Sequence, residues 1–117
     1  MSKKSGCNRR ADEDSNMNRH QLAEQRSRML HIKIAAKLRD HPNLWRIPWQ
    51  NLQRWEKEMQ RLPPALAEWR QILQTTPREE ILALLESDSE EAARLRSSTP
   101  FTGILTEVER QHTRVRP

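Results

Sequence analysis

The sequence has 117 residues and contains no tyrosine, one phenylalanine and only two glycines. Valine, which is common in strands, occurs twice. Strands favour β-branched and aromatic side chains, and tight hairpin turns favour glycine. Because both kinds of residue are scarce, the composition argues against a β-sheet fold and predicts an all-α protein.

Cysteine and long apolar runs are also nearly absent. Cys7 is the single cysteine, so no disulfide can form within the chain, which fits a reducing compartment. A membrane-spanning helix needs about 18 or more apolar residues, and no stretch approaches that length. The N-terminus lacks the apolar core of a secretory signal. We therefore expect a cytoplasmic protein with no membrane partner.

Large aliphatic residues are few. Leu, Ile, Val and Phe together supply 22 of 117 residues, about 19%. That share lies just below the level that indicates disorder. The tryptophans and the periodic alanines argue against disorder of the whole chain, but we expect loose ends or a core that a partner completes.

All four tryptophans lie within residues 44–73, at positions 45, 49, 55 and 69. One buried tryptophan removes on the order of 200 Å² from water, so we expect the other helices to assemble on this segment. Trp45, Leu52, Trp55 and Met59 are spaced to share one helix face.

Prolines divide this tryptophan segment. Pro48 suits the first turn of a helix, and the Leu62-Pro63-Pro64 run ends that helix and begins the next. The pattern predicts a Trp-rich central hairpin of helices 48–60 and 64–74, inside a bundle of about five to six helices.

The N-terminal third is basic, with ten Lys/Arg against five Asp/Glu in residues 1–41. Residues 1–16 are polar and predict a disordered tail, and residues 17–117 predict a single helical domain. Apolar spacing predicts a long helix over residues 18–40. A solvated surface is the default interpretation of its charges, and nucleic-acid contact is the alternative. The candidate contact residues are Lys3, Lys4, Arg9, Arg10, Arg19, Arg28, Lys33 and Lys37.

Helix-start signals divide the C-terminal half. Thr76 with Glu79, and Thr106 with Glu109, have the spacing of a capping box. Ser89 precedes two glutamates that suit the first turn of a helix. These signals predict helix starts near residues 77, 90 and 107.

Residues 95–105 form the most distinctive stretch outside the tryptophan segment. A hydroxyl-rich run with Pro100 excludes a simple helix, and Phe101 follows. An ordered loop that inserts Phe101 into the core is the favoured interpretation, and a functional loop is the alternative. If the loop is functional, Arg96, Ser97, Ser98 and Phe101 are the candidate partner-binding residues.

Catalytic and metal-binding patterns are missing. His20 and His31 lie eleven residues apart, roughly 16 Å along a helix, which is too far to share one metal ion. His31 is interpreted as a hydrogen-bonded packing residue. No spacing links a nucleophile, a base and an oxyanion donor, and no glycine-rich phosphate loop is present. We expect no catalytic residues, no metal site and no cofactor.

Three segments carry a family resemblance: LHIKIAAKL at 30–38, NLQRW at 51–55, and LRSSTPFTGILTEVER at 95–110. With them, the chain resembles small helical bacterial proteins or C-terminal domains that are associated with toxin–antitoxin modules, over about residues 30–110. Such domains are often attached to a helix-turn-helix DNA-binding domain, for which the chain has no room before Leu22. The resemblance implies a cytoplasmic non-enzyme that binds a partner protein, such as a toxin it neutralises.

Two functional hypotheses follow. The first is a non-enzymatic, antitoxin-like, protein-binding module that neutralises or regulates a partner through helix surfaces. The alternative is a small basic nucleic-acid-binding protein, a transcription regulator, that uses the N-terminal helix and tail. An enzyme ranks below both, and self-association into a homo-oligomer is left open by the sequence.

Overall fold

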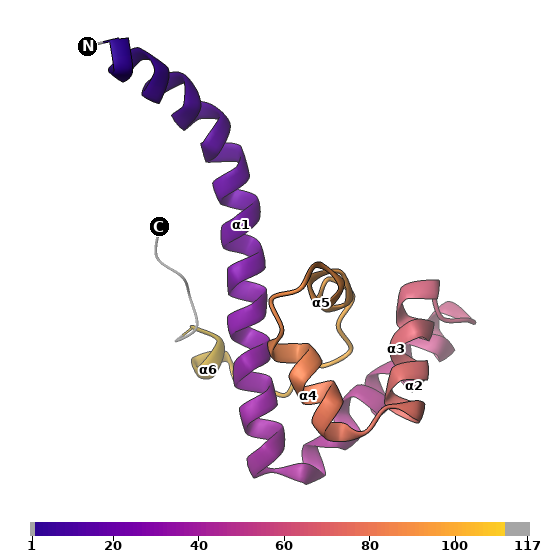
Figure 1. Cartoon of the computed structure of the whole chain (residues 1–117). Helices are drawn as coiled ribbons and strands as arrows, with labels where there is room; N and C mark the ends of the chain where they lie inside the picture. The colour runs from indigo at the N-terminus through magenta and orange to yellow at the C-terminus, as the bar shows by residue number, and fades with distance from the viewer. Residues whose placement is uncertain (1, 112–117) are drawn as a thin grey trace.

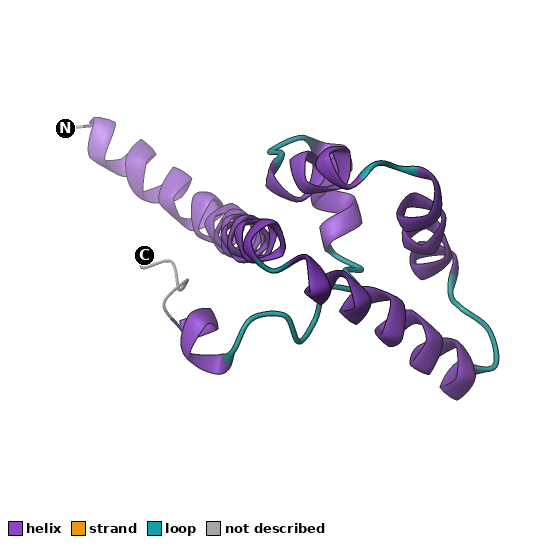
Figure 2. Ribbon diagram, turned by 90° about the horizontal axis from the view of Figure 1, so that it is seen from below, coloured by secondary structure: helices purple, strands orange, loops and turns teal. Residues whose placement is uncertain are grey.

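Six α-helices and one 3-10 turn make up the described part of the chain, which contains no strand (Figure 2). This computed structural model describes the backbone of residues 2–111 and the side chains of Arg19 and residues 21–111. The elements are α1 (Ser2–Asp40), η1 (Pro42–Trp45), α2 (Arg46–Met59), α3 (Pro64–Thr75), α4 (Arg78–Glu86), α5 (Glu90–Arg96) and α6 (Glu107–Gln111). The predicted all-α fold is confirmed.

Helix α1 begins at Ser2, well before residue 18, where apolar spacing predicts its start. It therefore includes residues 2–16, for which the sequence predicts a disordered tail. No proline interrupts the chain before Pro42, so nothing in this stretch forces the helix to start later. The division into a tail (1–16) and a domain (17–117) stays a prediction.

Helix α1 runs along one side of the molecule, and its N-terminal part extends beyond the other helices (Figure 1). Its C-terminal half packs against α4 and α5, while α6 lies beside its other side (Figure 1). The α2–α3 hairpin stands away from α1 and is joined to it through η1. This arrangement leaves a central space, which the segment after α5 fills.

The core is centred on Phe101, which is fully buried. Its ring meets Trp45 edge-on, with centroids 6.2 Å apart, and Trp69 edge-on, with centroids 5.3 Å apart. This geometry is favourable for aromatic pairs. Leu38 of α1 and Leu85 of α4 complete the buried surroundings of this aromatic cluster. The prediction that an ordered loop inserts Phe101 into the core is confirmed.

The predicted Trp-rich hairpin is present as α2 and α3, but only part of it is core. Trp45 and Trp69 are 5% and 0% exposed, whereas Trp49 and Trp55 are half-buried and Met59 is 50% exposed. The apolar face that begins at Trp45 is therefore buried at its start and becomes exposed along α2 toward the hairpin tip. The large apolar residues near that tip are available at the surface.

Two of the three predicted helix starts have the expected cap. The Ser89 hydroxyl accepts from the Ala92 N–H at 3.1 Å. Thr106 and Glu109 form a reciprocal capping box, at 2.8 and 3.2 Å. The third start is also confirmed, because α4 begins at Arg78, but its predicted capping box is wrong. The N-cap residue is Pro77, which has no side-chain acceptor, and Thr76 lies one position earlier as the C-cap of α3.

Candidate binding site around the 97–106 loop

The 97–106 loop connects α5 to α6 and runs between the α2–α3 hairpin and α1. The buried Asn51 amide fixes it by donating to the carbonyl oxygens of Pro100 and Thr102, both at 2.8 Å. These two carbonyls flank Phe101. Gly103 has φ +97°, a left-handed conformation that glycine adopts without strain. The loop is therefore held on a defined path.

Two of the four predicted partner-binding residues are structural. Phe101 is fully buried, and Arg96 is 4% exposed. Arg96 donates to the carbonyl oxygens of Ser87 at 2.6 Å and Leu85 at 3.3 Å, which ties α5 to the end of α4. Ser97 is exposed and Ser98 is half-buried. Of the four, these two serines are the ones that a partner can reach. Partner binding by all four stays a prediction.

Ser97 and Ser98 line an open groove together with the tip of the hairpin. The groove has a volume of about 510 Å³. One wall is apolar, and the other carries hydroxyl groups. We call it the hairpin groove, and its principal lining residues are Trp55, Met59, Leu66, Ser97, Ser98 and Thr99.

The hairpin side of this groove was not predicted from the sequence. The spacing of Trp55 and Met59 places them on the same face as Trp45, which suggests burial. They are not fully buried because they lie near the hairpin tip, where the other helices do not cover them, and the sequence does not show how the helices are arranged. The available signal was the Pro63-Pro64 turn, which marks where that face ends.

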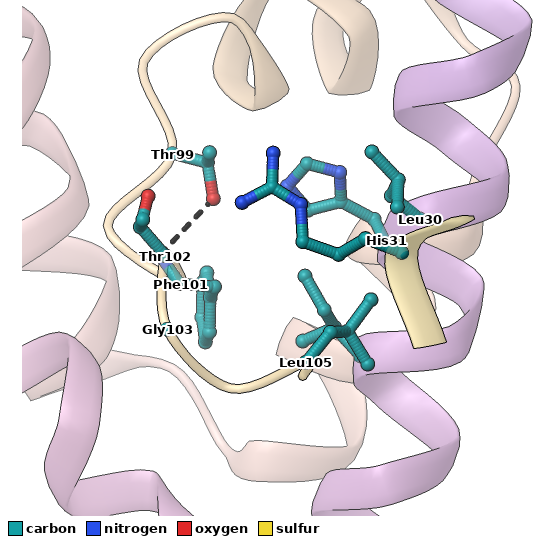
Figure 3. A pocket seen from close by; sticks show the side chains of 9 residues that line it. Leu30, His31, Thr99, Phe101, Thr102, Gly103 and Leu105 are labelled. Atoms are coloured by element: carbon teal, nitrogen blue, oxygen red, sulfur yellow. Dashed lines mark hydrogen bonds between the residues drawn. The ribbon is translucent and has the colours of Figure 1, made fainter. Parts of the chain in front are cut away.

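A smaller pocket lies on the other side of the loop, facing α1 (Figure 3). Its volume is about 120 Å³. Leu30, His31 and Ile34 of α1 form one wall, and loop residues including Phe101 and Leu105 form the other. We call it the His31 pocket. Thr99 and Thr102 line both the hairpin groove and the His31 pocket, so the loop separates the two hollows.

His31 is a buried, hydrogen-bonded residue, as predicted, with 4% of its surface exposed. Its Nδ1 lies 2.6 Å from the Ser27 carbonyl oxygen. The pKa of His31 is lowered to about 4, chiefly by burial; the hydrogen bond to Ser27 acts in the opposite direction, and the positive charge of Arg96 adds to the lowering. The imidazole is therefore neutral at pH 7.

Comparisons of this chain with protein-family models, with curated proteins and with solved structures give no match. The resemblance to toxin–antitoxin proteins accordingly stays an expectation that rests on the three sequence segments.

Three of the residues predicted to contact nucleic acid hold α1 to other parts of the chain. Arg28 donates to the Glu86 carbonyl oxygen at 2.8 Å, and Lys33 donates to that of Glu109 at 3.4 Å. Lys37 donates to the Ile104 carbonyl oxygen at 2.8 Å and pairs with the Glu109 carboxylate at 2.7 Å. These three cations already form hydrogen bonds within the chain, so fewer of their N–H groups are available to bind phosphates.

The remaining nucleic-acid candidates lie nearer the N-terminus. Arg19 is exposed on α1. The side chains of Lys3, Lys4, Arg9 and Arg10 lie outside the described part of the structure. Nucleic-acid contact by this group stays a prediction.

Among the described residues, no group of three or more His, Cys, Asp or Glu side chains is arranged to hold a metal ion. In the same part of the chain, none of the helices combines the length and apolar character needed to span a membrane.

Proposed function

We propose that the chain is a non-enzymatic, protein-binding module of the antitoxin-like kind that its sequence resembles, and that a partner protein docks in the hairpin groove. The observation that carries the proposal is the meeting of Trp55 and Met59 with Ser97 and Ser98, some 40 residues later in the chain. Tryptophan is a frequent anchor of protein interfaces, and methionine adapts its shape to different partners.

The surrounding charges favour an apolar partner segment flanked by acidic residues. Glu56 pairs with Arg70 at 2.9 Å, and Glu68 pairs with Arg94 at 2.9 Å. These pairs neutralise two of the three carboxylates of the hairpin, leaving Glu58. Lys57 and Arg61 are exposed, and the structure shows no ion pair between either of them and another described residue. The hairpin tip, which contributes Met59 to the groove, is thus more basic than acidic.

The test is co-expression with the product of the adjacent gene, followed by size-exclusion chromatography and titration calorimetry. The variant Met59→Asp places a charge in the apolar wall and is expected to weaken the complex about tenfold or more. Gln50→Asp, an exposed position on the same helix outside the groove, is the matched control and should leave affinity unchanged.

Equal affinities for the two variants would contradict docking in the groove. The absence of any complex, together with a neighbouring gene product that is harmless to cells, would contradict the antitoxin-like function as a whole. Duplex DNA or RNA binding that weakens steeply between two salt concentrations would favour the nucleic-acid alternative.

A further inference from the structure

The outer face of α1 carries apolar side chains that no other described element covers. On the inner face, His31, Ile34 and Leu38 are buried. Met29 and Ile32 lie on the outer face and are 44% and 36% exposed. Because each residue of a helix is rotated by about 100° from the one before, these two lie roughly 100–160° around α1 from His31.

The residues of this outer face recur in alternating steps of three and four positions, the spacing by which one helix packs along another. They span about 21 Å, or about four turns, at about 1.5 Å per residue. Leu22, at one end, is half-buried, and Ala36, at the other, is exposed. We call this face the outer stripe, and its residues are Leu22, Gln25, Met29, Ile32 and Ala36.

The elements that pack on α1 leave the outer stripe uncovered. Helices α4 and α5 lie on one side of α1, where Arg28 donates to the Glu86 carbonyl oxygen. Helix α6 lies on the other side, where Lys37 pairs with Glu109 (Figure 1). The stripe occupies the surface of α1 between these two contacts, on the side away from the core.

Basic side chains border the stripe. Residues 21–40 contain five Lys/Arg and two Asp/Glu. Arg26 and Lys33 lie seven positions apart along one border. Arg26 is exposed and forms no hydrogen bond or ion pair with another described residue, and Lys33 donates to a carbonyl oxygen of α6 at 3.4 Å. Their positive charges are therefore not neutralised by a carboxylate of the described chain.

These charges favour one occupant of the stripe over two others. A second copy of α1 would bring its own Arg26 and Lys33 against a border of the same sign, which disfavours pairing. Helices that lie on membranes usually insert a face rich in Trp, Phe and Leu, whereas the large apolar residues of the stripe are Leu22, Met29 and Ile32. A helix with acidic borders matches both the spacing and the charge.

We propose that the outer stripe docks an amphipathic α-helix of a partner protein whose apolar residues are flanked by Asp or Glu. The apolar residues of this helix pack against Met29 and Ile32, and its carboxylates pair with Arg26 and Lys33. The hairpin groove is lined by α2, α3 and the 97–106 loop, so the stripe is a separate surface. The inference therefore does not rest on the proposed function.

The test uses the full chain and fluorescein-labelled helical peptides of about four heptads, with leucine at the a and d positions. One peptide has glutamate at the flanking e and g positions, and the other has lysine there. In fluorescence anisotropy, the acidic peptide is expected to bind with a dissociation constant of about 1–100 μM. The basic peptide should bind at least about tenfold more weakly. A scrambled acidic peptide, which has no continuous apolar face, should also bind at least about tenfold more weakly.

Variants of exposed positions identify the surface. Ile32→Glu places a negative charge in the stripe and should weaken binding of the acidic peptide about tenfold or more. Met29→Glu repeats this test at a second position, and circular dichroism checks that each variant stays helical. Val108→Glu, an apolar-to-charged change on α6, is the matched control. Arg26→Gln should weaken binding about threefold, and Arg61→Gln, at the hairpin tip, should not.

The proposal would be overturned if the acidic peptide bound no more tightly than the basic or the scrambled one. Equal weakening by Ile32→Glu and Val108→Glu would also overturn it. So would self-association of the chain, or binding to phosphatidylserine vesicles, that Ile32→Glu abolished, because a second copy or a membrane would then occupy the stripe. Met59→Asp, in the hairpin groove, should leave peptide binding unchanged, which separates this test from that of the proposed function.

Discussion

A single side chain, Asn51, joins two segments that lie half the chain apart. Its amide nitrogen donates to the carbonyl oxygens of Pro100 and Thr102, and its oxygen accepts from Arg54 at 3.0 Å. Every hydrogen-bonding atom of this buried amide thus has a partner. Asn51 fixes the backbone on both sides of Phe101 and so determines where the loop lies.

Asn51→Ala should therefore destabilise the protein by about 2–3 kcal/mol, because it leaves two loop carbonyl groups without donors. Urea unfolding measures this change. Gln53→Ala, at an exposed position two residues later in α2, is the control and should change stability by less than about 0.5 kcal/mol. Equal effects of the two substitutions would show that the amide does not hold the loop.

The neutral His31 ring makes stability depend on pH. Its pKa is about 4 in the folded chain, against the ordinary value of 6.5, so the unfolded chain binds the proton more tightly. The associated stability is fully present above pH 6.5 and is lost as the pH falls toward 4. Its full size is about 3 kcal/mol.

The measurement compares the free energy of unfolding of the wild type and His31→Gln across pH 7 to 4. The wild type should lose stability relative to the variant in this window. The pKa of Glu109 is held near 2, chiefly by its hydrogen bond with Lys37, so that group titrates below the window. If the free energies of unfolding of the wild type and the variant changed equally with pH, burial of a neutral imidazole would be contradicted.

The roles of some single residues can be predicted from the sequence, and those of others cannot. His31 was correctly interpreted as a packing residue, because it follows Leu30 in an apolar stripe. The roles of Asn51 and Arg96 were not predicted, because their hydrogen-bond partners lie on other elements. A polar residue amid apolar neighbours signals burial, but the sequence does not state which distant carbonyl group it meets.

At the scale of helices, caps that look alike in sequence differ in the structure. Ser89 caps α5, whereas Thr76 makes no capping hydrogen bond at the start of α4. Ser89→Ala should cost about 1 kcal/mol, and Thr76→Ala should cost clearly less. Thermal unfolding of the two variants measures the difference. An equal or larger loss for Thr76→Ala would restore the predicted capping box.

The helices themselves were largely predictable. Apolar spacing and the prolines located α2 to α5 to within a few residues, because proline restricts the backbone wherever it occurs. The start of α1 was not predicted, because residues 2–16 are polar and lack the helical spacing of apolar residues on which the prediction rests. The α4 cap was misassigned because Thr76 lies between two helices and serves as the end of the first.

In the whole molecule, Phe101 joins the loop that carries it to η1, through Trp45, and to α3, through Trp69. Phe101→Ala should lower stability by about 3–5 kcal/mol, because it leaves a cavity and removes two aromatic contacts. Thermal unfolding followed by tryptophan fluorescence measures the loss.

Val108→Ala is the control for this substitution, since Val108 is 62% exposed and should change stability by less than about 0.5 kcal/mol. A loss below about 1 kcal/mol for Phe101→Ala would show that the core does not depend on this ring.

Both hollows beside the loop are properties of the whole molecule. The sequence pointed to Ser97 and Ser98, but it gave no sign that they face Trp55 and Met59. It likewise placed Arg110 at a helix end without relating it to the His31 pocket, which Arg110 lines. Such pairings depend on the path of the 97–106 loop, which contacts between distant segments determine.

Those distant contacts also bear on how quickly the chain reaches its native state. Asn51 and Pro100 are 49 positions apart, Arg28 and Glu86 are 58 apart, and Lys33 and Glu109 are 76 apart. Helical proteins usually fold fast because their contacts are local, and each long closure costs chain entropy before its contacts form. This protein should therefore refold more slowly than a simple antiparallel bundle of its length, with docking of the 97–106 loop as its late step.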